Sequence, residues 1–152
     1  MKKFRFRLNT LRKLREAHRD EMRAKLDEAY QALRILEDQI SAAGEEVAQL
    51  QAAQRGALDG DMADVNAMLE AGRYQAVLRS QQKTMQDQIQ LLTPEIERRR
   101  QAVIVADKEV RILDKLEERQ RAEHRHLRQR AEISELDEIG SQSVEAENQW
   151  AL

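Results

Sequence analysis

Apolar side chains recur along the first third of the chain with the alternating three- and four-residue steps of a heptad repeat. The steps are regular from Leu26 onward, and a stutter of four-residue steps precedes it. The members of this series, which include one histidine, are Leu11, Leu14, His18, Met22, Leu26, Ala29, Leu33, Leu36, Ile40, Ala43, Val47 and Leu50. Asn9 or Thr10 is suited to cap the first turn. The pattern predicts a helix over residues 10–55 with one apolar face that requires a partner.

A second series of the same kind occupies the other half of the chain. Its members are Tyr74, Leu78, Met85, Ile89, Leu92, Ile96, Arg99, Val103, Ala106, Val110 and Leu113. Between the two series, the sequence RGALDGDMADVN holds Gly56 and Gly60 and is the clearest break in the chain. We therefore expect a break over residues 56–72 and a second helix over residues 73–138.

Two long helices joined by one break predict an all-α fold, a long antiparallel two-helix coiled coil in the form of a helical hairpin. We expect a single domain over residues 1–140. Residues 141–152 lack the repeat and are predicted to form a flexible tail. Because the two repeats can pair within one chain, the free protein is predicted to be a monomer.

The single proline lies inside the second series, in the sequence LLTPEIE. Thr93 as a cap, Pro94 at the first helical position and Glu95 in the first turn could start a third helix. A reversal of direction between helices needs a connection of about 2 to 5 residues. The heptad spacing from Leu92 to Ile96 leaves no room for one. The sequence therefore predicts a continuous helix with a kink near Pro94.

The composition agrees with an elongated helical fold, because 36% of the residues are charged and only 3% are aromatic. Cysteine is absent, which excludes a disulfide framework and a thiolate metal site. The chain shows no apolar run of the length that a signal peptide or a transmembrane helix needs. The sequence thus predicts a cytoplasmic protein without direct membrane insertion.

Charge is distributed unevenly along a chain whose net charge is −2. Residues 1–25 hold ten basic and three acidic side chains, a surplus of +7. The corresponding net charges are −8 for residues 26–72, +4 for residues 73–133 and −5 for residues 134–152. A hairpin would therefore have a basic open end and an acidic tip. The basic end could be a solvated surface, a docking surface for an acidic protein, or a nucleic-acid-binding surface.

The sequence offers little that resembles a catalytic or metal site. His124 and His126 are two residues apart and point to opposite sides of a helix, so they cannot share a metal ion as an i, i+4 pair does. A two-helix fold lacks the concave pocket that acid–base catalysis needs, and the chain carries no glycine-rich phosphate loop. We therefore expect no enzyme activity, no cofactor and no metal.

Three segments of the sequence together resemble the FliJ family of flagellar export proteins. They are KFRFRLNTLRKLREAHRDE near the start, YQAVL after the break, and KEVRILDKLEERQRAEHRHLRQRAEISELDE near the end. The resemblance extends over residues 3–139. It implies an antiparallel coiled coil similar to part of the gamma-subunit shaft of the rotary ATP synthase. It also implies a stalk that docks in the hexameric flagellar export ATPase, promotes ring assembly, links the ring to the membrane export gate protein FlhA, and binds export chaperones.

The resemblance also implies a role in flagellum biogenesis, and hence in motility and chemotaxis, at the cytoplasmic face of the inner membrane. The open end would contact the ATPase ring through the segment over residues 123–139 and through five basic residues. These are Lys3, Arg5, Arg7, Arg12 and Arg15.

The export-gate patch of the family uses an aromatic residue and a leucine one turn apart, and Tyr74 and Leu78 match that spacing. Gln39 matches a further polar position of the patch, and a shift of one register would replace Leu78 by Val77. On the residues alone, Tyr74 and Leu78 could equally well close the hairpin. Two alternative functions stay open: the stalk of a virulence type III secretion system, and a nucleic-acid-binding coiled coil that uses the basic end.

Overall fold

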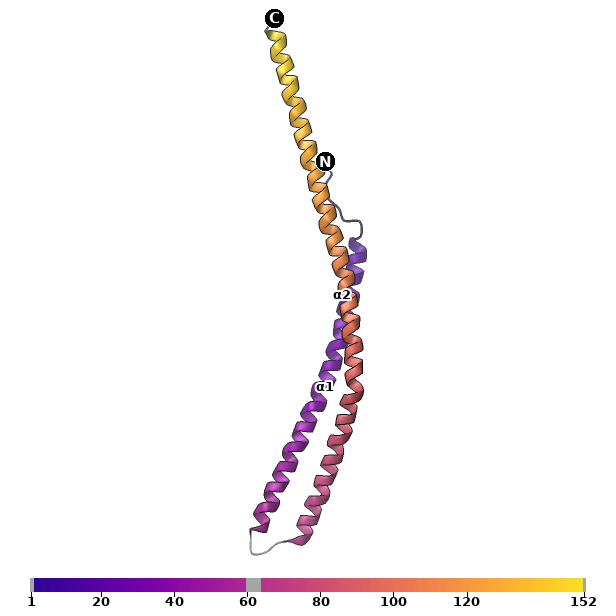
Figure 1. Cartoon of the computed structure of the whole chain (residues 1–152), viewed down its shortest axis with the longest axis vertical. Coiled ribbons are helices and arrows are strands. Elements are labelled where there is room, and N and C mark those ends of the chain that lie inside the picture. The colour runs from indigo at the N-terminus through magenta and orange to yellow at the C-terminus, as the bar shows by residue number, and fades with distance from the viewer. Residues whose placement is uncertain (1, 60–63, 152) are drawn as a thin grey trace. The chain divides into compact units, whose positions relative to one another are not determined.

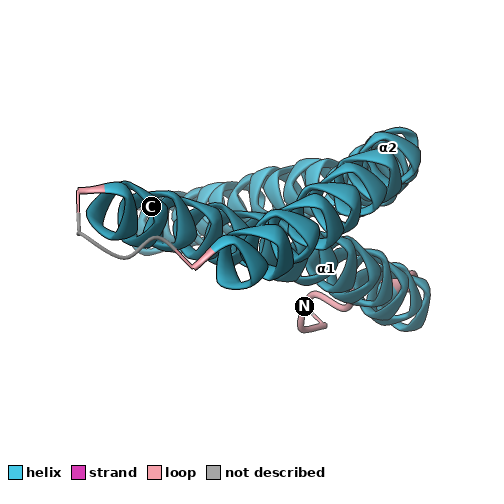
Figure 2. Ribbon diagram, turned by 90° about the horizontal axis from the view of Figure 1, so that it is seen from below, coloured by secondary structure: helices cyan, strands magenta, loops and turns pink. Residues whose placement is uncertain are grey.

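The structure is a computed structural model that describes residues 2–59 and 64–151 and contains two helices, α1 (Asn9–Leu58) and α2 (Val65–Trp150). The helices run in opposite directions (Figure 1), and the described residues include no strand (Figure 2). The predicted all-α helical hairpin is therefore confirmed.

Contacts divide the chain into two units, and both helices contribute to each. The terminal unit comprises residues 2–19 and 106–151, and the hairpin unit comprises the described residues of 20–105.

The break between the helices is shorter than the sequence predicted. The Asp64 carboxylate accepts hydrogen bonds from the backbone N–H groups of Asn66 and Ala67, at 3.0 and 3.3 Å, and so caps the start of α2. Helix α2 therefore begins at Val65 rather than at residue 73, and Gly72 lies within it. Residues 60–63 of the predicted break, including Gly60, lie outside the described residues.

The structure also corrects the predicted end of the second helix. Residues 141–150, predicted to be a flexible tail, are helical, and every residue from 125 to 151 is exposed. The hydroxyls of Ser141 and Ser143 donate to the carbonyls of Glu138 and Gly140, at 3.0 and 2.8 Å. The missing heptad repeat thus indicated a helix without a packing partner, because Glu, Ala and Gln favour helix whether or not they are buried.

Helix α2 passes through Pro94 without interruption, so the chain forms no third helix at this position. Pro94 has no N–H to donate to the carbonyl four residues before it. The neighbouring Thr93 hydroxyl donates to the Ile89 carbonyl at 2.9 Å. Ile96, two residues after the proline, is 9% exposed and belongs to the core of the hairpin unit.

The hairpin unit has a narrow core between α1 and α2 that follows the predicted heptad positions. Its buried side chains are Ala29 and Ala43 on α1 and Leu78 and Ile96 on α2. A polar contact crosses the same interface, where Gln82 Nε2 donates to the Ile40 carbonyl at 3.1 Å.

Gly44 allows this contact, because a Cβ at this position would lie 3.3 Å from the Gln82 amide nitrogen. A further seam position of α2 is also polar. The Arg99 guanidinium donates to the Lys25 carbonyl at 2.6 Å and to the Glu95 carboxylate at 3.0 Å. The Arg99 guanidinium is therefore satisfied by a carbonyl across the interface and by a carboxylate on its own helix.

In the terminal unit, the side of α1 that faces α2 differs from the predicted side. Leu11 and Leu14, predicted to face α2, are 37% and 65% exposed, and His18 is exposed as well. Arg12 and Arg15 occupy the partly buried positions instead. Partly buried positions of α1 recur at alternating steps of three and four residues, at Arg12, Arg15, Arg19, Met22 and Leu26. The stutter predicted from the leucines is therefore absent from the buried positions.

The physical reason for this register lies on α2. Its core residues in this unit are Ala106, Val110 and Leu113, and carboxylates flank them. Arg12 forms an ion pair with Glu117, and Arg15 Nη1 lies 3.1 Å from Glu109 Oε2. Helix α1 therefore presents arginines to α2, and its leucines face outward.

Candidate interaction sites

The segment before α1 is not helical and is held against α2 by its two phenylalanines. Phe6 is 7% exposed. The Phe4 ring lies 5.6 Å from the His124 ring, between centroids, and the Arg121 guanidinium lies 5.0 Å from the Phe4 centroid. His124 Nε2 also donates to the Lys2 carbonyl at 3.0 Å. The sequence FRF thus anchors residues 2–8 on the surface of α2.

The five basic residues predicted to contact the ATPase ring fall into two groups. Lys3, Arg5 and Arg7 are exposed on the anchored segment. Arg12 and Arg15 are partly buried between the helices and form the ion pairs with Glu117 and Glu109 described above. The structure therefore assigns different environments to side chains that the sequence grouped by charge alone.

Arg12 belongs to a network of polar contacts. Its Nη2 donates to Asn9 Oδ1 at 2.8 Å, and Arg121 Nη2 donates to the second oxygen of Glu117 at 2.9 Å. The Asn9 side chain, proposed from the sequence as a helix cap, therefore accepts a hydrogen bond from the Arg12 side chain. The first backbone hydrogen bond of the helix runs from the Arg12 N–H to the Leu8 carbonyl, at 2.9 Å. These contacts join the start of α1 to α2.

A depression of about 650 Å³ lies beside the anchored phenylalanines. Arg5, Arg7, Arg12 and Arg121 contribute to its lining, together with Glu117. Guanidinium groups recognise carboxylates through paired hydrogen bonds, so this surface suits an acidic side chain of a protein partner.

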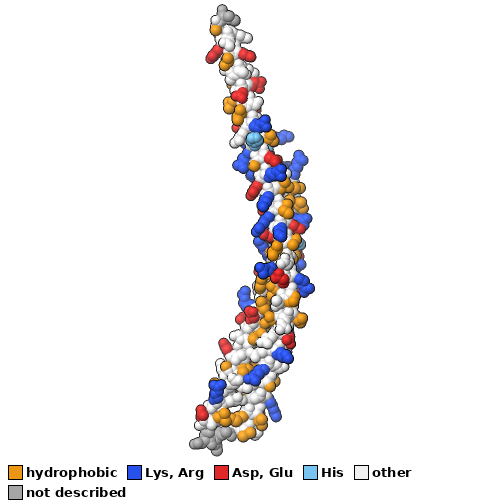
Figure 3. Space-filling model, in the orientation of Figure 1, with side chains coloured by type: hydrophobic (Ala, Val, Ile, Leu, Met, Phe, Trp, Pro, Cys, Tyr) orange, Lys and Arg blue, Asp and Glu red, His pale blue; other side chains and the backbone are white. Residues whose placement is uncertain are grey.

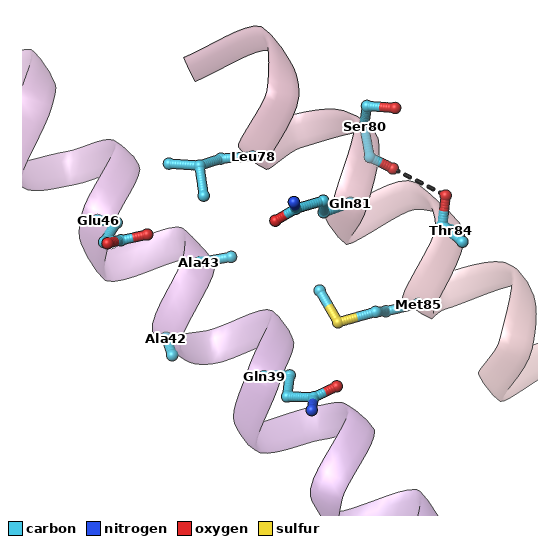
Figure 4. Close-up of a pocket in the computed structure, with 9 residues that line it drawn as sticks. All are labelled: Gln39, Ala42, Ala43, Glu46, Leu78, Ser80, Gln81, Thr84 and Met85. Carbon is cyan, nitrogen blue, oxygen red and sulfur yellow. Dashed lines mark hydrogen bonds between the residues drawn. The ribbon is translucent and has the colours of Figure 1, made fainter. Parts of the chain in front are cut away.

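A second hollow lies between α1 and α2 in the hairpin unit, with a volume of about 680 Å³ (Figure 4). Ala42 and Ala43 on α1 are small, and in Figure 4 Leu78 and Met85 of α2 point toward α1. Gln39 contributes to the lining from α1. The groove is therefore formed where small side chains on one helix oppose larger ones on the other.

The three residues predicted to bind the export gate lie in different environments. Leu78 is only 4% exposed and packs between the helices, whereas Tyr74 is 46% exposed. Gln39 is exposed at the groove. Val77, the alternative to Leu78 in the shifted register, is 50% exposed. The accessible side chains of this patch are thus Tyr74, Val77 and Gln39, and Leu78 supports them from the core.

Tyr74 is held by α1. Its hydroxyl lies 3.3 Å from each carboxylate oxygen of Glu46 and donates a hydrogen bond to that group. The negative charge of Glu46 raises the pKa of the Tyr74 phenol above its ordinary value of 10.0, and burial and the hydrogen bond act in the same direction. The phenol therefore remains a neutral donor that orients the ring on the surface.

Replacement of Glu46 by Gln is expected to bring the pKa of Tyr74 down toward its ordinary value. The measurement is the ultraviolet absorbance of the phenolate in a Tyr30→Phe background, in which Tyr74 is the remaining tyrosine. Because the folded pKa is the higher one, this contact stabilises the fold fully below pH 10 and is lost as the pH rises through the folded value. A titration curve that Glu46→Gln leaves unchanged would contradict the contact.

Within residues 2–59 and 64–151, no three His, Cys, Asp or Glu side chains are grouped as metal ligands would be. Over the same ranges, neither helix has a stretch long and apolar enough to cross a bilayer.

Comparison with known protein families identifies a match over most of the chain. The family described as "Flagellar FliJ protein" matches residues 4–149, which is nearly the whole chain. No curated protein and no solved structure matches the chain. The match covers residues 4–8 of the anchored segment, all of α1, and α2 as far as residue 149.

Proposed function

Because the chain belongs to the flagellar FliJ family of export proteins, we propose that it is the non-enzymatic stalk of the bacterial flagellar type III export apparatus. In this role it docks in the hexameric export ATPase, promotes assembly of the ring, and links the ring to the export gate protein FlhA. It also binds export chaperones and acts in the cytoplasm, at the inner face of the membrane. The observation that carries the proposal is the family match over residues 4–149, together with the two-helix fold.

The terminal unit is the proposed contact with the ATPase ring. Lys3, Arg5 and Arg7 project from a segment that Phe4 and Phe6 hold in place, so their charges are presented on an ordered surface. Arg12 and Arg15 contribute mainly by fixing α1 against α2. The same packing favours a protein partner over a nucleic acid, because the two phenylalanines are occupied by α2 and do not present faces for base stacking.

Reversal of the three exposed charges, in a Lys3→Glu, Arg5→Glu, Arg7→Glu variant, is expected to slow association with the export ATPase about tenfold or more at low salt. The salt dependence of the association rate should become flatter, because opposite charges steer the encounter. The measurement is stopped-flow association at several salt concentrations, with circular dichroism to confirm that helix content is unchanged.

The matched control for this prediction carries the same change in charge elsewhere. Arg34, Arg73 and Arg79 are exposed residues of the hairpin unit, and their replacement by Glu should leave the association rate close to that of the original chain. Failure of the unmodified chain to bind the flagellar export ATPase would refute the proposed function. An equal effect of the two triple variants would instead refute the assignment of the surface.

The patch formed by Tyr74, Val77 and Gln39 is the proposed contact with the export gate. Tyr74 is oriented by Glu46, and Val77 provides an apolar side chain beside it. An aromatic side chain and an aliphatic neighbour are typical anchors in protein interfaces. Leu78 contributes by holding α2 against α1, so its effect on binding is indirect.

A further inference from the structure

The apolar face formed by Leu8 and the first turns of α1 has no partner among the described residues of its own chain. Leu8 and Leu11 are each 37% exposed and Leu14 is 65% exposed, at successive three-residue steps. Arg12 and Arg15, on a different side of the helix, make the contacts with α2. The leucine face lies in a strongly basic region, since residues 2–19 hold eight basic and one acidic side chain.

The end of α2 also exposes apolar side chains, but it is acidic where the leucine face is basic. Ile133, Leu136, Ile139 and Val144 are between 56% and 67% exposed. Residues 131–152 hold six acidic side chains and no basic one. The view in Figure 3 shows red and orange side chains on this part of α2. An apolar and acidic helical surface therefore stands without a partner in the described part of the chain.

The two surfaces cannot meet within one chain while α2 is continuous. Arg12 pairs with Glu117, and the Lys2 carbonyl bonds to His124, so the start of α1 lies level with this part of α2. Helix α2 continues beyond these contacts to Trp150. At 1.5 Å per residue, Leu136 lies about 28 Å along the helix from Glu117. A second molecule is required to cover both surfaces.

We propose that two copies of the chain associate antiparallel to one another, with the end of α2 of each copy packed on the Leu8–Leu14 face of the other. Leu136 of one copy would then lie beside Leu11 of its partner, and the two-fold axis would pass near residue 127 of α2. Leu127 is 54% exposed and is available for contact at this axis.

Charge complementarity favours this pairing over a dimer in which the two α2 ends pack on each other. Two α2 ends packed on each other would bring six acidic side chains against six, without a basic residue to offset them. Packing of the α2 end on the leucine face brings an acidic surface onto a basic one, and two-fold symmetry forms the contact twice. The inference rests on the charges and exposed side chains of the terminal unit. It concerns the free chain and not the chain docked in the export ATPase.

This arrangement differs from the monomer expected from the sequence. That expectation placed Leu11 and Leu14 against α2, where one chain would bury them. The structure places them outside, so that pairing within one chain leaves two apolar surfaces uncovered.

Sedimentation equilibrium of the purified full chain, at concentrations up to about 200 μM, is expected to show a monomer–dimer equilibrium that weakens with added salt. Leu11→Glu and Leu136→Lys should each weaken the dimer about tenfold or more. The double variant should recover part of this loss, because Glu at position 11 then faces Lys at position 136 of the other copy. Leu91→Glu, at a residue 78% exposed in the hairpin unit, is the matched control and should leave the equilibrium unchanged.

A carbodiimide, which joins amines directly to carboxylates, tests the contact on the unmodified chain. In a mixture of ¹⁴N- and ¹⁵N-labelled chains, Lys13 should be joined to Glu135 or Glu138 in peptides of mixed isotope composition. A monomer at every concentration would overturn the proposal. A dimer that Leu11→Glu and Leu136→Lys do not weaken, or that lacks these mixed cross-links, would overturn it as well.

Discussion

Replacement of Leu78 by Ala is expected to lower the free energy of unfolding by about 3 kcal/mol. Leu78 is 4% exposed and points from α2 toward the small residues of α1 (Figure 4), so its removal leaves a void in a narrow core. Val77→Ala, at the adjacent and half-exposed position, should change stability by less than about 0.5 kcal/mol. Urea unfolding followed by circular dichroism measures both values.

The same residues are expected to behave differently in binding. Tyr74→Ala and Val77→Ala should keep the fold and each weaken binding to the export gate protein by roughly 2 kcal/mol, because both side chains are accessible. Titration calorimetry with the soluble domain of the gate protein measures this loss, and Leu91→Ala is the control at a distant exposed residue. A stable Leu78→Ala variant that loses the gate protein would show that Leu78 is itself an anchor.

Most of the fold could be predicted because heptad periodicity is a local property of the sequence. The repeat identified two helices, and its unbroken spacing around Pro94 correctly excluded a third. It failed at the start of α1, where the apolar pattern selected Leu11 and Leu14. The register there is set by Glu109 and Glu117, which are about a hundred residues away in the sequence and pair with arginines. Such pairs cannot be recognised until the helices are aligned.

The helix boundaries illustrate a different limit. The glycines predict an end to helical structure, but α2 begins earlier because the Asp64 carboxylate satisfies its first N–H groups. The absence of a repeat after residue 138 predicts that the helix ends there, whereas α2 continues to Trp150. Periodicity reports which face is buried, whereas the helix itself depends on backbone hydrogen bonds and on propensity.

The charge pattern of the sequence indicates where the candidate sites lie, but it does not show which side chains contact one another. The basic surplus near the start indicated a docking surface, yet it did not separate Arg5 and Arg7 on the surface from Arg12 in the interface. One signal was available in the sequence FRF, since side chains two residues apart share a face of an extended segment. That spacing indicates a segment anchored by Phe4 and Phe6, as the structure shows.

The anchoring of this segment leads to the second large effect. Phe6→Ala is expected to destabilise the packing of residues 2–8 by about 2–3 kcal/mol, because Phe6 is 7% exposed and its ring lies 5.9 Å from the Arg12 guanidinium. Trypsin should then cleave after Arg5 and Arg7 several-fold faster, since local release exposes these bonds. The helix content of α1 and α2 should remain nearly the same by circular dichroism.

Phe6→Leu restores most of the buried apolar volume and should bring cleavage back close to the original rate. Ile112→Ala, at a residue 65% exposed in the same unit, is the control for a loss of apolar surface without loss of the anchor. Association of Phe6→Ala with the export ATPase should also slow, because Lys3, Arg5 and Arg7 are then no longer presented on an ordered segment. Unchanged cleavage in Phe6→Ala would mean that Phe4 and its contacts with His124 and Arg121 suffice to hold the segment.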